Sequence, residues 1–236
     1  MVCFAAIMRR LIIAIDGTTA AGKSTAGRAL ARSLGYIYID TGAMYRAVGL
    51  AAIEAGISLD DAGALSDLAH RVAIRFEGDP QRPTVTLDGR DVTAAIRTPA
   101  VDEAASKVSV VPGVREAMVA QQREMGRAGG ALLDGRDIGT HVFPNADVKF
   151  FFSADPIVRA QRRHDENLAR GRDESLDETL AALEVRDHRD ETRDVLTKMW
   201  DRLGYYLRSK LIVMVIVGVL TYISLLLIGV PYALLL

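Results

Sequence analysis

Short apolar runs alternate with longer stretches of helical character along much of the chain. The first run, residues 11–15, is continuous enough for a strand buried on both faces, and residues 131–134 form another short buried strand that ends in an acid. Further strands are predicted at residues 36–40 and 148–152, and helices at residues 26–34, 41–55, 114–125 and 155–169. Strands that alternate with helices in this way are typical of an α/β protein.

One internal region departs from this alternation of strands and helices. Residues 72–76 and 84–87 alternate or turn in the manner of short antiparallel strands. The dipeptide Asp88-Gly89, directly after the second of them, is a strong hairpin signal. We therefore predict a small antiparallel β subdomain inserted at residues 72–97.

The C-terminal segment from Leu211 to Leu236 carries no charged residue. As a helix it would be roughly 39 Å long, which is enough to cross a hydrocarbon core of about 30 Å with tilt. We predict a transmembrane-type helix here, preceded by a juxtamembrane segment at residues 195–210; the alternative is a buried core helix. Because basic residues precede the segment and no charge follows it, the positive-inside rule places the preceding domain in the cytoplasm, anchored to the inner face of the membrane.

The overall composition narrows the class of protein. A chain of 236 residues can bury one substantial core and is long enough for an enzyme. Its 29 Lys and Arg residues nearly balance 30 Asp and Glu residues, so no global field attracts nucleic acid and we expect no nucleic-acid partner. The single cysteine, Cys3, excludes an internal disulfide framework and suits a reducing cytoplasm. We expect a monomer.

The strongest chemical motif is a candidate phosphate-binding loop between a predicted strand and a predicted helix. It reads Gly17-Thr18-Thr19-Ala20-Ala21-Gly22-Lys23-Ser24, and Thr25 follows it. The glycines let backbone N–H groups turn toward a phosphate chain, and the helix start adds the positive end of its dipole. Lys23 would reach the outer phosphates, and the Ser24 hydroxyl would bind Mg²⁺, with Asp134 as a partner through water. The alternative is a glycine-rich turn that binds nothing.

Two further polar elements stand at the ends of predicted strands, where ligands of open α/β sheets collect. Asp40-Thr41 leads directly into a helix that carries Arg46, and Asp134-Gly135-Arg136-Asp137 ends a later strand. Farther on, residues 155–170 and 184–194 are rich in arginine. A solvated, salt-bridged helix face is the alternative for both arginine-rich stretches, and periodicity does not separate the two interpretations.

Taken in order, the phosphate loop, residues 40–46, residues 134–140 and Val142-Phe143-Pro144 closely resemble the motifs of bacterial cytidylate kinases. The resemblance runs from about Arg10 to Asp194, and we assign residues 1–194 to one cytidylate-kinase-like domain. It implies the P-loop nucleoside monophosphate kinase fold, which has a parallel sheet flanked by helices and a mobile lid. It also implies an enzyme, a phosphotransferase that uses ATP and Mg²⁺ to convert CMP and dCMP to CDP and dCDP.

The resemblance implies roles for individual residues as well. Thr41 and Arg46 match contacts to the acceptor phosphate, and Ser106, Arg115 and Asp137 match contacts around the cytosine ring. A carboxylate beside an arginine and a hydroxyl can distinguish the exocyclic amine of cytosine from O4 of uracil. Four further residues match the family's contacts to ribose and phosphate: Arg136, Arg186, Asp190 and Arg193. The residues expected to act on the transferring group are Lys23, Arg136 and the lid arginines Arg159 and Arg163.

The chain departs from the family pattern after Arg193, where the expected last strand and closing helix have no clear counterpart. Their loss would leave one sheet edge, and the apolar residues of the strand at 148–152, exposed. Residues 218–236 instead resemble one span of polytopic permeases that include autoinducer exporters. Two functions follow as alternatives: a working CMP kinase with a membrane-anchoring tail, or an inactive or nucleotide-binding-only fusion relic. Another small-molecule P-loop kinase is disfavoured by residues 134–137.

Overall fold

The computed structural model describes residues 10–169, 171, 174–185, 187, 188, 210 and 214. The chain divides into two compact units, Met1–Leu183 and Glu184–Leu236. The sheets and helices named below, and the site residues whose positions are described, all belong to the first unit. The proposed boundaries of the domain at 194 and of the juxtamembrane segment at 195 lie outside the described residues and stay predictions.

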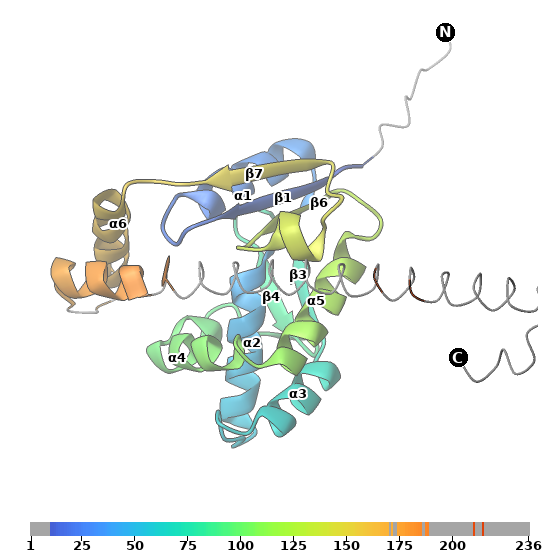
Figure 1. The fold of residues 1–236 in the computed structure, drawn as a ribbon, viewed down its shortest axis with the longest axis horizontal. Coiled ribbons are helices and arrows are strands. Elements are labelled where there is room, and N and C mark those ends of the chain that lie inside the picture. Colours follow the sequence, from blue (N-terminus) through green and yellow to red (C-terminus); the bar gives the residue numbers. More distant parts are fainter. Residues whose placement is uncertain are drawn as a thin grey trace, which may run out of the picture. The chain divides into compact units, whose positions relative to one another are not determined.

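A four-stranded parallel sheet forms the centre of the first unit (Figure 1). Its strands stand in the order β2 (Ile37–Asp40), β6 (Ala131–Asp134), β1 (Ile12–Gly17) and β7 (Val148–Phe152). The predicted parallel sheet is thus confirmed, and β6 and β7 have the expected bounds. The register pairs Ile15 with Asp134 and Asp40 with Asp134, so the polar carboxyl ends of three neighbouring strands meet at one edge.

The two faces of the sheet are covered by different helices because successive side chains of a strand point to opposite faces. On one face Ile13, Ile15, Tyr38 and Leu132 pack against Ala31 of α1 (Lys23–Leu34). On the other face Ala14, Ile39 and Leu133 join a larger cluster. That cluster includes residues of α2 (Thr41–Glu54) and α5 (Pro112–Gly126), and Figure 1 shows these helices gathered on the side of the strands away from α1.

The sequence analysis did not predict two helices that contribute to the larger cluster, α3 (Ala62–Arg71) and α4 (Pro99–Val108). The start of α4 carries a local signal, because Thr98 caps the helix by accepting the N–H of Val101 and Pro99 occupies its first position. Helix α4 packs closely on α2. A Cβ added at Gly49 would lie 3.0 Å from the backbone nitrogen of Ala105, so a larger residue at 49 would push the two helices apart.

A three-stranded antiparallel sheet is formed by β3 (Ile74–Glu77), β4 (Thr84–Leu87) and β5 (Arg90–Asp91). The turn between β4 and β5 is Asp88-Gly89, and both residues have positive φ, at 51° and 81°. This is the combination that a two-residue hairpin turn requires, so the hairpin predicted from Asp88-Gly89 is confirmed. The limits of the inserted subdomain, 72 and 97, remain predictions.

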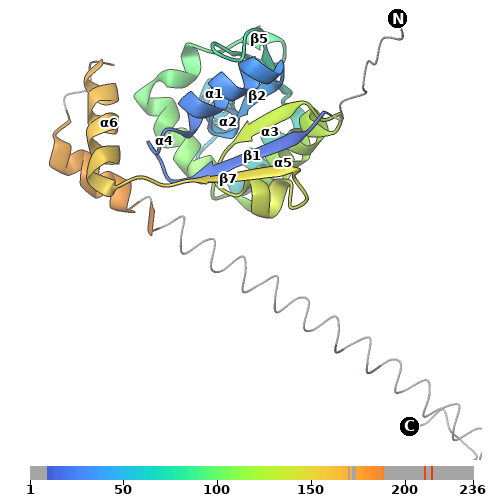
Figure 2. The ribbon, with the colours of Figure 1, turned by 90° about the horizontal axis from the view of Figure 1, so that it is seen from above.

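Strand β7 stands at the edge of the parallel sheet, and within the described residues β1 is its one partner. Figure 2 shows the two strands side by side, with β7 continuing toward α6 (Pro156–Ala169). The side chains of Phe150 and Phe151 are 43% and 73% exposed, whereas every residue of β6 is buried. Apolar exposure on an edge strand is what the sequence analysis expected if no further strand follows β7.

The predicted transmembrane-type segment 211–236 lies outside the described residues, apart from Met214. Among the helices that the structure does describe, none is both long and apolar enough to span a membrane. The C-terminal membrane segment therefore stays a prediction from sequence.

Candidate active site

The phosphate loop connects the end of β1 to the start of α1. Gly17 has a φ of 142°, and a Cβ at this position would overlap the carbonyl oxygen of Phe152, so the close approach of β7 requires glycine. Gly22, with a φ of 95°, is the N-cap of α1 and provides no side-chain cap. Helix α1 begins at Lys23, whereas the pattern predicted a start at residue 26. The earlier start places the uncapped N–H groups of the first turn directly after the loop, where an anion can accept them.

Lys23 lies back across the phosphate loop. Its Nζ donates to the carbonyl oxygen of Thr18 at 2.7 Å. The Oγ1 atom of Thr18 is buried and has no hydrogen-bond partner among the described residues. A loop that holds an amine and an unsatisfied hydroxyl is suited to a ligand that carries several oxygen atoms.

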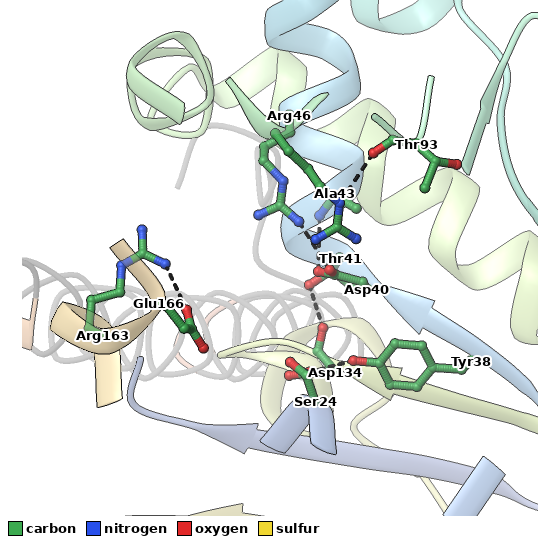
Figure 3. A network of polar contacts seen from close by, with 11 residues as sticks. Ser24, Tyr38, Asp40, Thr41, Ala43, Arg46, Thr93, Asp134, Arg163 and Glu166 are labelled. Carbon is green, nitrogen blue, oxygen red and sulfur yellow. Dashed lines mark hydrogen bonds and ion pairs between the residues drawn. The ribbon is translucent and has the colours of Figure 1, made fainter. Parts of the chain in front are cut away.

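Ser24, Tyr38 and Asp134 come from α1, β2 and β6 and meet at one carboxylate oxygen, as Figure 3 shows. The Ser24 hydroxyl donates to Asp134 Oδ2 at 2.6 Å, and the Tyr38 hydroxyl donates to the same atom at 2.7 Å. Burial raises the pKa of Asp134, and the nearby charge of Asp40 raises it further. Burial also raises the pKa of Tyr38, so its hydroxyl keeps the proton that it donates. With its hydrogen directed to Asp134, the Ser24 oxygen retains lone pairs for a cation.

Arg46 and Thr41, the residues matched to an acceptor phosphate, stand at the start of α2 (Figure 3). Asp40 caps this helix by accepting the N–H of Ala43 at 3.0 Å, and its other oxygen holds Arg46 Nη2 at 3.0 Å. The Nε of Arg46 is buried and has no hydrogen-bond partner among the described residues. Thr41 donates its hydroxyl to the carbonyl oxygen of Asp134 at 2.8 Å. The strand end at Asp134 is thereby tied to the helix that carries Arg46.

Arg115 and Asp137, two of the three residues matched to the cytosine ring, form an ion pair. Arg115 Nη2 lies 2.6 Å from Asp137 Oδ2, and the two side chains are 22% and 27% exposed. The pair joins α5 to the loop after β6, and both side chains stay partly exposed. The third residue, Ser106, lies on α4 and is exposed.

The arginines matched to phosphate contacts differ in where they lie. Arg136 donates to the hydroxyl of Thr19, and Arg159, which is 5% exposed, points its Nη1 at the carbonyl oxygen of Thr19 at 3.4 Å. Arg163 instead pairs with Glu166 at 3.4 Å (Figure 3). Arg162, which the sequence analysis did not select, points its Nη1 at the carbonyl oxygen of Ala20 at 3.4 Å. Spacing could not separate Arg162 from Arg163, because separations of three and four residues both share a helix face with Arg159.

The sequence analysis also missed Asp16, the penultimate residue of β1. Its side chain is 7% exposed and accepts two backbone N–H groups, from Ile138 and from Gly139, each at 2.7 Å. Burial raises the pKa of Asp16, and the two N–H bonds and the charge of Lys23 offset part of that effect. The only local signal was an acid at the end of a buried apolar strand.

Three predicted site residues, Arg186, Asp190 and Arg193, lie outside the described residues. Thr25 is described and is exposed on the first turn of α1. The structure therefore brings together the phosphate loop, residues 134–137, Arg46, Arg115 and Arg159.

Comparison with known proteins gives two family matches. The sequence model of the family described as cytidylate kinase matches residues 13–201, and that of the AI-2E family transporter matches residues 173–236. The second match bears out the resemblance of the tail to a transporter segment. The two matched ranges overlap at residues 173–201.

Curated relatives cover most of the chain. The cytidylate kinase of Syntrophotalea carbinolica is 50% identical over 185 residues, which are 78% of this chain and 79% of the relative. That of Geobacter sulfurreducens is 50% identical over 190 residues, 80% of this chain and 82% of the relative. A bifunctional pantoate ligase/cytidylate kinase of Synechococcus sp. is 50% identical over 188 residues, 78% of this chain and 35% of the relative.

These matches favour the kinase over the alternative of an inert fusion relic. They also agree with the parallel sheet, the phosphate loop and the cluster of residues at its edge. The chain belongs to the cytidylate kinase family and is an enzyme of the nucleoside monophosphate kinase class.

Proposed function

We propose that the protein transfers the γ-phosphoryl group of ATP to CMP and dCMP, which gives CDP and dCDP. The observation that carries this proposal is the set of contacts made by residues 134–137. Asp134 binds Ser24, Arg136 reaches Thr19, and Asp137 pairs with Arg115. One short segment therefore connects the loop suited to donor phosphates with the residues suited to an acceptor base.

The preference for cytosine rests on the pairing chemistry of Arg115 and Asp137. The exocyclic amine of cytosine donates to a carboxylate, and its O2 and N3 accept from a guanidinium or a hydroxyl. Uracil presents O4 where cytosine has the amine, so O4 would face the carboxylate of Asp137. A site that leaves a buried polar group unpaired rejects such an analogue strongly. Ser106 on α4 is the proposed hydroxyl.

The donor side is proposed to hold ATP with Mg²⁺. The N–H groups at the start of α1, Lys23 and the unsatisfied hydroxyl of Thr18 fit a chain of phosphates. Ser24 fits a Mg²⁺ ligand, and Asp134 would contact the ion through water. When bound, Mg²⁺ neutralises negative charge on the donor phosphates.

Phosphoryl transfer needs positioning and positive charge more than a dedicated base. An oxygen of the acceptor phosphate, oriented by Arg46 and Thr41, bonds to the γ-phosphorus while the bond to the β,γ-bridging oxygen breaks and ADP leaves. Lys23, Arg136 and Arg159 supply positive charge from the loop side. Arg163 would join them once it leaves Glu166, and Arg186, Asp190 and Arg193 are proposed to complete the ribose and phosphate contacts.

Titration calorimetry on the full chain tests the base preference. We expect CMP and dCMP to bind more tightly than UMP and AMP. Equal affinity for CMP and UMP would contradict the cytosine assignment, whereas tight CMP binding without ADP formation in a coupled assay would contradict the transfer.

The proposed location is the cytoplasmic face of the membrane, with the kinase domain a monomer that acts on small molecules and not on nucleic acid. The support is the charge-free segment 211–236 and the basic residues before it. Carbonate-washed membranes should retain the full chain. A chain truncated after Lys210 should appear in the supernatant, and recovery of both forms there would contradict membrane anchoring.

A further inference from the structure

A single buried carboxylate, that of Asp16, holds the turn that follows the proposed base-binding residue. Its Oδ1 accepts the N–H of Ile138 and its Oδ2 accepts the N–H of Gly139, both at 2.7 Å. These two N–H groups are the first in η2 (Ile138–Val142), a π-helical turn that begins directly after Asp137. The N–H groups at the start of a helical turn have no partner inside the turn and must find one elsewhere.

The residue that would ordinarily supply that partner is Asp137. Aspartate at an N-cap position usually accepts an N–H from the turn that it precedes. Asp137 occupies the N-cap of η2, yet its side chain makes no capping hydrogen bond. Its Oδ2 instead lies 2.6 Å from Arg115 Nη2. Asp16, on strand β1, already accepts the first two N–H groups of η2. The Asp137 carboxylate is therefore not needed to cap the turn.

The close approach of Asp16 depends on the glycine at position 139. A Cβ there would lie 3.2 Å from Asp16 Oδ2 and 3.0 Å from Cδ of Lys149. Ile138, the other residue that Asp16 holds, is 1% exposed. The turn is therefore packed on both sides, and the position of Asp137 is set by a contact to β1, the strand that leads into the phosphate loop.

We propose that Asp16 is a positioning residue for acceptor specificity: it holds the first N–H groups of η2 and thereby keeps Asp137 available to the cytosine ring. This inference rests on the proposed function, because it presumes that Asp137 and Arg115 recognise the base. The contacts of the Asp16 carboxylate described here are to backbone N–H groups of the turn. The effect of Asp16 reaches the acceptor through Asp137.

Steady-state kinetics of the full chain with the substitution Asp16→Asn tests the proposal. The amide keeps one accepting oxygen but turns an N–H donor toward a backbone N–H, so Asp137 is drawn back toward the uncapped turn. We expect the KM for CMP to rise by about tenfold or more, as for loss of a hydrogen bond to a charged group, with the KM for ATP within about twofold. The preference for CMP over UMP should shrink.

A double-variant cycle separates positioning from general damage. If Asp16 acts through Asp137, the pair Asp16→Asn with Asp137→Asn should raise the CMP KM no further than Asp137→Asn alone. The matched control is Asp147→Asn. Asp147 also accepts a backbone N–H of β1, that of Ile12 at 2.9 Å, but at the end of the strand opposite to Asp16. We expect this control to leave both KM values unchanged.

Several results would overturn the proposal. Equal rises in the KM for CMP and ATP would mean a purely structural role, and additive effects in the cycle would mean that Asp16 does not act through Asp137. Should Asp16→Asn not fold, Gly139→Ala pushes the turn off an intact Asp16 and carries the same expectations. A wild-type chain without CMP preference would refute the proposed function itself, whereas an unchanged preference in both variants would refute only this inference.

Discussion

The hydroxyl of Ser24 donates to Oδ2 of Asp134 at 2.6 Å and joins residues that are 110 positions apart in the chain. The bond connects the first turn of α1 to the end of β6. Tyr38 donates to the same oxygen from β2, so three elements share one buried carboxylate. Because this oxygen accepts two hydrogen bonds in a buried setting, each donor should matter both to stability and to the orientation of Ser24.

Removing one of the two donors tests that relationship. Tyr38→Phe should lower the free energy of unfolding by about 1–3 kcal/mol, because a buried carboxylate loses a hydrogen bond and keeps its desolvation cost. Urea denaturation measures the loss. The matched control is Tyr36→Phe. The partly buried hydroxyl of Tyr36 accepts the N–H of Leu11 at 3.0 Å, and its removal should lower the free energy of unfolding by less. Equal losses from the two variants would contradict a special role for the carboxylate.

The raised pKa of Asp134 predicts a pH dependence of stability. Because burial raises its folded-state pKa above the unfolded value of about 3.9, the folded state binds the proton more tightly. The stability gained in this way is fully present below the unfolded-state pKa and is lost as the pH rises through the folded-state pKa. The loss is about 1.4 kcal/mol for each pKa unit that separates the two states.

This dependence can be isolated by substitution. Asp134→Asn removes the titrating group, so the stability of the wild type relative to this variant should fall as pH rises from about 4 through the folded pKa. Urea denaturation at several pH values measures the difference. Asp16 carries a pKa raised in the same direction and is present in both proteins, so its contribution cancels. A constant difference across that pH range would contradict the raised pKa.

Lys23 should be required for transfer and dispensable for acceptor binding. Its Nζ donates a hydrogen bond to the carbonyl oxygen of Thr18 within the phosphate loop. We expect Lys23→Ala to reduce turnover by about a thousandfold, since it removes a charge aimed at the transferring group, while CMP affinity stays nearly intact. A coupled ADP assay and calorimetry provide the two readouts. Retained turnover, or an equal loss of CMP binding, would contradict the placement of Lys23 on donor phosphates.

The exposed edge strand predicts an aggregation site. Phe151 on β7 is 73% exposed, and edge strands of this kind pair with other chains. Phe151→Lys should reduce concentration-dependent light scattering while changing the unfolding free energy by no more than about 0.5 kcal/mol. Phe152→Lys is the comparison. Phe152 packs against the apolar cluster between the sheet and α1, so this substitution should destabilise the fold. Unchanged scattering in Phe151→Lys would show that this edge is protected.

Several features of this protein could be predicted because their signals are local. The apolar run before Gly17, the glycines of the phosphate loop and the turn at Asp88-Gly89 depend on residues that are neighbours in sequence, and the structure has each of these elements in place. The start of α4 at Thr98-Pro99 is a local signal of the same kind and could have been found.

The contacts that define the site were decided by tertiary structure. A hydrogen bond requires its two heavy atoms within about 3 Å, and that distance depends on strand order and register rather than on residue type. Asp16 meets Gly139, 123 positions away, because β1 lies beside β6 with Ile15 opposite Asp134. The sequence by itself determined the fold class, the phosphate loop and a set of candidate acids and arginines. Only the tertiary structure decided that Asp16 holds the turn, through the pairing of β1 with β6, and that Asp137 faces Arg115, through the packing of α5 beside β6 and η2.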